Sequence, residues 1–264
     1  MQKPTFLSFI RIIGASFKLQ TKERMVQDFF VFTLIYQPIL FTILTVGTYL
    51  FGGKPNFGLF AITGAGMVGI WNNNLWSSGE IVDHERSSGT LSLLIASPTP
   101  LLFVLLGKSL ANAITSIIAM GMTFATGAIV YHLPLGIADP LGFVGGLFFT
   151  VIALTCLGLV IGSLFVLSRN SGYAMNVANY PIYLLSGLAV PLSILPVWTR
   201  PISDSLATTW GNLVLNQAAG SLSGSVLTSI LWLISLSLIY LLIAFGLYKH
   251  VEHRALSLGN LELW

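Results

Sequence analysis

Charged side chains are scarce in this chain. They make up 8% of its 264 residues, whereas a soluble domain carries about 25%. Hydrophobic residues make up 55%, and several apolar runs approach the roughly 20 residues that a helix needs to cross a bilayer. A transmembrane barrel would instead show short segments of alternating polarity. The composition therefore predicts one all-α membrane domain over residues 1–264.

Cysteine and intramembrane acidic residues are nearly absent as well. The single cysteine, Cys156, lies in an apolar run, so no disulfide can form within the chain. Asp28 begins the first apolar run, and Asp139 and Asp204 lie outside the runs. Carriers coupled to protons or ions keep acidic side chains within the membrane for that purpose. Their absence here argues against a proton-driven pump.

Catalytic, nucleotide-binding and metal-binding motifs are missing too. Gly107-Lys108-Ser109 resembles the end of a phosphate-binding loop, but Leu102 stands where that loop requires a glycine. We therefore expect Lys108 to extend from an apolar helix to the inner membrane interface. His250 and His253 have helical spacing but lack a third ligand nearby. The sequence thus predicts no catalytic residue, no metal site and no cofactor of its own.

Six spanning helices are predicted from the apolar runs. They cover residues 29–51, 57–76, 101–131, 141–167, 173–190 and 226–248. An N-terminal interfacial helix (residues 1–28) precedes them, a cytosolic coupling segment (77–100) follows the second, and an outer segment (191–225) precedes the sixth. Glycine pairs spaced by four residues in the fourth span, at Gly142 and Gly146 and at Gly158 and Gly162, predict close helix packing.

The distribution of basic residues predicts the orientation. With the N-terminus inside, only Lys54 and Arg200 of the 12 Lys and Arg residues face outward. Basic residues favour the cytoplasmic side, so both termini are expected in the cytosol. The expected location of the chain is the plasma membrane of a prokaryotic cell, as an integral membrane protein. Because the basic residues are dispersed among loops, they indicate membrane orientation and not nucleic-acid binding.

The N-terminal segment has the pattern of an amphipathic helix. Its apolar residues recur at helical spacing, and its basic residues fall on another face. The apolar set is Phe6, Phe9, Ile10, Ile13 and Phe17, and the basic set is Arg11, Lys18 and Lys22. We expect this helix to lie on the anionic inner membrane surface. A solvated, loosely packed leader is the alternative.

The segment after the second span is a charged island between apolar runs. Its polar face is expected to hold Glu80, Asp83, Glu85 and Arg86, and its apolar face Leu91, Leu93, Leu94 and Ile95. Gly89-Thr90 divides it into two parts. Charge cannot lie in hydrocarbon, so the island is expected in water, with its charged side facing a soluble partner. An interfacial loop helix without a partner is the alternative.

The outer segment contains three prolines and a helical apolar pattern. Ile202, Leu206, Trp210 and Leu213 roughly share one face. This pattern predicts a short helix on, or dipping into, the outer leaflet, and an ordinary extracellular loop is the alternative.

Neutral polar side chains within the spans have two interpretations. They line a substrate route or form hydrogen bonds between helices, and such bonds are common in membrane bundles. Asn72, Asn73 and Asn74 form one such group. The candidates for the route are Tyr36, Gln37, Asn72, Asn176 and Asn179.

Two motifs resemble a known family. They are Glu85-Arg86-x-x-Gly89-Thr90-Leu91-x-x-Leu94 with Ser97-Pro98, and Ser186-Gly187-Leu188-Ala189-Val190-Pro191 with Leu195-Pro196-x-Trp198. Together with the six-span layout, they resemble the membrane subunit of ATP-binding-cassette exporters of the type-2 permease family. The resemblance implies that the first motif contacts an ATPase subunit. It assigns this coupling to Asp83, Glu85, Arg86, Gly89, Thr90, Leu91 and Leu94.

The resemblance also implies the partners and the reaction. Two separate ATPase subunits would bind ATP and Mg, and a second permease copy or a paralogous chain would complete the route through the membrane lipid. The chain itself would not be an enzyme. Because the spans offer aromatic and neutral polar groups, the expected substrate is amphipathic: a drug, a lipid or a lipid-linked glycan. The alternatives are a non-transporting membrane scaffold that recruits a cytosolic protein and, last, an intramembrane enzyme.

Overall fold

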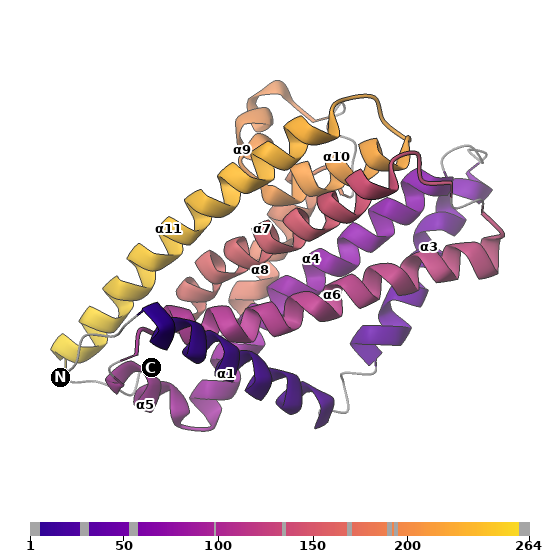
Figure 1. Ribbon diagram of the computed structural model, residues 1–264. Coiled ribbons are helices and arrows are strands. Elements are labelled where there is room, and N and C mark those ends of the chain that lie inside the picture. The colour runs from indigo at the N-terminus through magenta and orange to yellow at the C-terminus, as the bar shows by residue number, and fades with distance from the viewer. Residues whose placement is uncertain are drawn as a thin grey trace.

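The computed structural model describes residues 6–26, 32–52, 58–97, 99–133, 136–167, 171–188, 192 and 195–258. Within these ranges the regular elements are helices, and no strand occurs. The all-α prediction is therefore confirmed for the part of the chain that the structure describes. The long helices run broadly along one direction, with short helices at the two ends (Figure 1).

A helix occurs at each of the six predicted span positions. They are η1 with α3 (Phe32–Tyr36, Gln37–Phe51), α4 (Gly58–Ser87), α6 (Leu101–Tyr131), α7 (Pro140–Leu167), α8 (Ser171–Leu185) and α11 (Val226–Leu258). Four stretches within the described residues are long and apolar enough to cross a membrane: Leu34–Phe51, Leu101–Tyr131, Pro140–Val166 and Val226–Arg254. Helix α8 has 15 residues, and α4 carries charge in its last turns. The count of six spans stays a prediction.

Helix α7 lies in the middle of the bundle. It packs against α11 and against α4, α6 and α10, and α11 runs along one edge of the molecule (Figure 1). Its glycines permit this closeness, because a Cβ at Gly146 would lie 3.0 Å from a methyl of Val214, and one at Gly158 would lie 2.6 Å from Ser78 Oγ. The predicted packing role of these glycines is confirmed.

The predicted outer segment folds into the bundle as helices. It contains η3 (Val197–Thr199), α9 (Arg200–Asp204) and α10 (Ala207–Ala219). Val214 and Asn216 on α10 are fully buried, and Asn216 forms a hydrogen bond with Thr63 of α4. The alternative of an ordinary loop is therefore wrong. This short half-polar helix is buried because α4, α7 and α11 pack against it, and Asn216 finds a partner on α4.

Helix α1 (Phe6–Val26) packs along α6 and shares one end of the bundle with α5 (Thr90–Ala96); we call this the α1/α5 end (Figure 1). The rings of Phe9 and Phe103 stack 4.5 Å apart. Gly107 has no room for a Cβ because the backbone of Ile13 lies against it. The basic residues predicted on the other face, Arg11, Lys18 and Lys22, are exposed. Its docking on α6 rules out a loosely packed leader.

Candidate functional site

The first candidate site is the turn between α4 and α5, which we call the α4–α5 corner (residues 80–96). Helix α4 continues past the predicted span end at Trp76 and stops at Ser87. The Ser88 amide donates to the His84 carbonyl, and the Gly89 amide donates to the Arg86 carbonyl. Gly89 has φ +69°, the left-handed conformation that favours glycine at helix ends. The predicted division of the segment at Gly89-Thr90 is confirmed.

Glu85 points into the bundle and not toward solvent. Its residue exposure is 6%, and its Oε1 accepts a hydrogen bond from Lys108 Nζ at 2.5 Å. The Thr90 hydroxyl donates to the second carboxylate oxygen. The expectation that Glu85 lies on an outward polar face is therefore wrong for its side chain. A cation buried on α6 attracts the carboxylate inward, which helical periodicity alone does not reveal.

Lys108 is buried and paired, so the expectation that it extends to the membrane interface is wrong. Its side chain is 1% exposed, and besides Glu85 it donates to Glu23 Oε2 of α1 at 2.9 Å. A buried ammonium is costly unless paired and hydrogen-bonded. Two carboxylates meet that requirement, one from α1 and one from α4.

A second ion pair lies beside the first. Arg24 of α1, which is 7% exposed, donates to Glu80 Oε2 of α4 at 3.3 Å and to Asn73 Oδ1 at the same distance. Burial lowers the pKa of the Arg24 guanidinium, and Glu80 only partly offsets that effect. The pair connects α1 to α4, and its Coulomb attraction compensates only part of the cost of burying the guanidinium.

Arg86 binds the end of another helix. Its guanidinium donates to the carbonyl oxygens of Phe165 and Val166, at 3.3 and 3.0 Å, in the last turn of α7. A cation there satisfies carbonyls that lack helical partners and complements the negative end of the helix dipole. Arg86 also lies 3.8 Å from Asp83, which remains partly exposed. The corner is thus fixed to α1, α6 and α7.

The apolar side of α5 differs from its prediction at one position. Leu91 and Ile95 are buried and Leu94 packs against them, but Leu93 is 69% exposed. In a helix, positions 91, 94 and 95 share a face, and position 93 lies opposite. The exposed residues of the corner are Glu80, His84, Ser87, Ser88, Gly89, Leu93 and Ala96. Coupling by the predicted residues stays a prediction, with Glu85, Arg86, Thr90 and Leu91 placed to shape the corner.

The residues predicted for a substrate route lie on η1, α3, α4 and α8. Asn179 of α8 accepts a hydrogen bond from Trp71 Nε1 of α4 at 2.8 Å. Asn72, the residue after Trp71, is buried. Gln37 is half-buried, while Tyr36 and Asn176 are exposed. Their participation in a route stays a prediction.

Asn73 and Asn74 have the other role that the sequence left open. Asn73 Nδ2 donates to Thr115 and Ser116 of α6, at 2.9 and 2.7 Å. Asn74 Nδ2 donates to Ser116, and its Oδ1 accepts from Thr155 of α7. These residues therefore form hydrogen bonds between helices.

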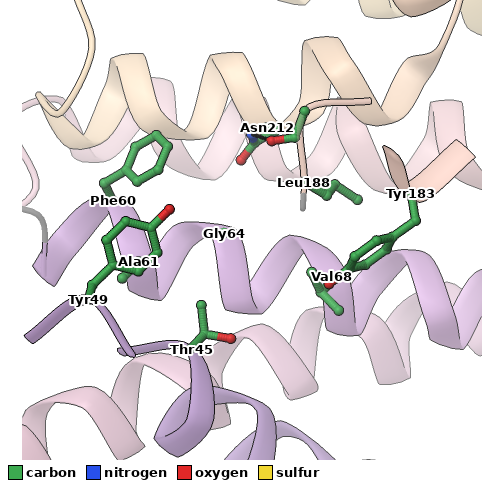
Figure 2. A pocket seen from close by; sticks show the side chains of 10 residues that line it. Thr45, Tyr49, Phe60, Ala61, Gly64, Val68, Tyr183, Leu188 and Asn212 are labelled. Carbon is green, nitrogen blue, oxygen red and sulfur yellow. Dashed lines mark hydrogen bonds between the residues drawn. The ribbon is translucent and has the colours of Figure 1, made fainter. Parts of the chain in front are cut away.

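The second candidate site is a lateral pocket between α3, α4, α8 and α10. Its lining residues are Thr45, Tyr49, Phe60, Ala61, Gly64, Val68, Tyr183, Gly187, Leu188 and Asn212. Figure 2 shows Tyr49 and Phe60 at one end of the pocket and Tyr183 with Val68 at the other, with Gly64 between them. The rings of Tyr49 and Phe60 meet edge to face, 6.1 Å apart.

The lining gives the lateral pocket a definite chemistry. No lining residue is charged, three are aromatic, and Thr45 and Asn212 supply polar groups. Such a lining suits an apolar molecule with a few hydrogen-bonding groups. The space that admits water measures about 40 Å³, enough for a few water molecules.

Sequence reasoning missed Glu23, Arg24 and Lys108 as residues that form the ion pairs behind the corner. One signal was available for Lys108: a lysine inside a 31-residue apolar helix requires a counter-charge or an exit to water. Its partners Glu85 and Glu23 are 23 and 85 positions away along the chain, so only the fold reveals them.

Comparison with known proteins identifies the family of this chain. The family model for the ABC-2 type transporter matches residues 11–218. The probable multidrug ABC transporter permease YbhR of Escherichia coli (strain K12) is 28% identical over 126 residues, as is the protein of that name from Escherichia coli O157:H7. The aligned part covers 46% of this chain and 33% of each relative, about a third of their length. Since the family model extends over most of its residues, this chain belongs to the ABC-2 type transporter family.

Proposed function

We propose that this chain is the membrane subunit of an ATP-driven exporter of amphipathic or lipid-like molecules. A separate ATP-binding-cassette ATPase binds the α4–α5 corner from the cytosol, and two permease chains, identical or related, form the complete route. The α1/α5 end is then cytosolic, as the distribution of basic residues favours. Membership in the ABC-2 type transporter family supports this assignment. The main structural support is the α4–α5 corner, which is exposed on one side and bonded to α6 and α7 on the other.

The α4–α5 corner is suited to receive force. Its outward side presents polar residues, among them Glu80 and His84, and the exposed Leu93, a surface that another protein can cover. On its inward side, Glu85 binds Lys108 of α6, and Arg86 binds the last turn of α7. A displacement of the corner therefore moves several helices together, as in a hinge-type transition between two states.

The lateral pocket supports the choice of substrate. Its lining is aromatic and uncharged, and the relatives named above are described as probable multidrug permeases. Ligands of drug size occupy pockets of about 300–1,000 Å³. The space of about 40 Å³ is too small for them, so the lining helices must separate before a substrate enters. An ATP-driven displacement of α4 supplies such a movement.

A matched pair of substitutions on α4 tests this function. A Cβ at Gly64 or at Gly69 would meet no atom within 4 Å, but only Gly64 lines the lateral pocket. We expect Gly64→Leu to fill the pocket and to reduce ATP-dependent transport of a fluorescent amphipathic dye strongly. Gly69→Leu should transport like the wild type. The measurement uses proteoliposomes that contain this chain and its ATPase.

Two results would contradict the proposal in different ways. Equal transport by the wild type and Gly64→Leu would exclude the lateral pocket from the route. Absence of ATP-dependent movement of dye or lipid in every preparation, with the ATPase bound, would favour the non-transporting scaffold.

A further inference from the structure

Lys108 receives one carboxylate from each of two other helices. Its Nζ lies 2.5 Å from Glu85 Oε1 of α4 and 2.9 Å from Glu23 Oε2 of α1. The lysine and Glu85 side chains are 1% and 7% exposed, whereas Glu23 is 26% exposed. The Lys108–Glu85 pair, which we call the enclosed arm, is thus buried, and the Lys108–Glu23 pair, the exposed arm, lies at the surface.

The enclosed arm continues into α5. Glu85 Oε1 is occupied by Lys108, and Thr90 donates to its other oxygen. Thr90 is the first residue of α5. The charge of Lys108 therefore binds the end of α4 and, through the same carboxylate, the start of α5. Removal of Lys108 would leave a buried carboxylate without its counter-charge, which is strongly destabilising.

Helix α1 is attached to α6 by apolar contacts and to α4 by polar side-chain bonds. Its apolar contacts run along α6, where Phe9 stacks on Phe103 and Ile13 lies against Gly107. The side-chain links toward α4 come from two adjacent residues, Glu23 through Lys108 and Arg24 directly to Glu80. Movement of the corner reaches α1 through these polar links and through α6.

We propose that Lys108 and Glu23 are positioning residues that make α1 and the α4–α5 corner a single moving body. The inference rests on the proposed function, because it gives this body the task of transmitting force from the ATPase. Helix α1 then follows the corner during each cycle, and Glu23 is the link between them that can be cut with least damage. When Glu23 is replaced, the buried Lys108 is still paired with the carboxylate of Glu85.

The test cuts only the exposed arm. Glu23→Met removes the bond from α1 to Lys108 and leaves the Arg24–Glu80 pair in place, and Lys22→Met changes the charge of an exposed neighbour as the control. Spin labels on cysteines at Lys18 of α1 and Ser88 of the corner, both exposed, report their separation in a Cys156→Ala background. The measurement uses the full chain in nanodiscs, without the ATPase.

We expect a narrow distance distribution for the parent and Lys22→Met, and a broader one with a second population for Glu23→Met. Melting temperatures should stay close to that of the parent. In proteoliposomes with the ATPase, dye transported per ATP hydrolysed should fall at least about fivefold for Glu23→Met, the lower end of coupling between sites.

The outcomes separate this inference from the proposed function. An unchanged distance distribution in Glu23→Met would overturn it, whether or not the chain transports. A broadened distribution with unchanged transport per ATP would overturn the transmission of force. If no preparation transports, the distances still decide whether α1 and the corner form one body, and the failure then falls on the proposed function.

Discussion

At the scale of single residues, the α4–α5 corner depends on inward-facing charge. Glu85 and Arg86 have the sequence pattern of a hydrophilic surface, yet one side chain binds Lys108 and the other binds the end of α7. Amino-acid type shows that such residues avoid lipid. It does not show whether water or an opposite charge receives them, because the partners are distant in the chain. The partners of Glu85 and Arg86 could therefore be identified only from the folded structure.

Gly89 offers a prediction at the same scale. Its φ of +69° disfavours any side chain, although a Cβ there would meet no atom within 4 Å. Gly89→Ala should therefore destabilise the protein by about 1–2 kcal/mol through backbone strain alone. Gly89→Asn should cost less, because asparagine tolerates this conformation better. Thermal unfolding in detergent measures both.

The control for this prediction is Gly14→Ala. Gly14 is an exposed residue within α1 whose Cβ would likewise be unobstructed. Alanine there should stabilise the helix slightly, by up to about 1 kcal/mol. Equal melting temperatures for Gly89→Ala and the parent would show that the turn at the corner relaxes without cost.

At the scale of elements, hydropathy predicted the positions of the helices better than the residues at which they end. The run ending at Trp76 predicted a span, but α4 continues to Ser87 because its backbone hydrogen bonds and its buried ion pairs do not require apolar side chains. The stop at Gly89 was visible in the sequence. The burial of α10 was not, because its Thr, Asn and Gln residues resemble those of a surface helix.

The contact between α4 and α7 gives an element-scale prediction. A Cβ at Gly158 would lie 2.6 Å from Ser78 Oγ, so Gly158→Ala should force the two helices apart and cost about 1–3 kcal/mol. Adding Ser78→Gly removes the obstructing hydroxyl and should recover part of the loss. Melting temperatures of the single and double variants measure this.

Gly145 supplies the comparison on the same helix. A Cβ there would approach Ile230 only to 4.0 Å, an ordinary contact, so Gly145→Ala should leave the melting temperature nearly unchanged. If Gly158→Ala were equally harmless, α4 and α7 would not be in close contact at this position.

At the scale of the whole molecule, the structure combines an exposed corner, buried ion pairs behind that corner and an uncharged pocket. The corner is attached to α1, α6 and α7, while the lateral pocket lies between α3, α4, α8 and α10. Helix α4 contributes residues to both sites and therefore connects them. The sequence motif located the corner. The pocket could not be foreseen, because its lining comes from four helices that only the fold brings together.

The exposed side of the α4–α5 corner is the proposed binding surface for the ATPase. Leu93 is 69% exposed on the outward side of α5, and Leu222, at the opposite end of the bundle, is 40% exposed. Leu93→Glu places a charge within the surface assigned to the ATPase. Leu222→Glu places the same charge far from that surface. Neither residue belongs to the buried core, so both variants should fold and insert.

The most direct measurement is vanadate-sensitive ATP hydrolysis that elutes with the tagged chain after purification from its native membrane in a mild detergent. We predict co-eluting activity for the wild type and for Leu222→Glu, and its loss for Leu93→Glu at an equal yield of folded chain. No co-eluting hydrolysis with the wild type, or equal activity with Leu93→Glu, would contradict the claim that an ATPase drives this protein through the α4–α5 corner.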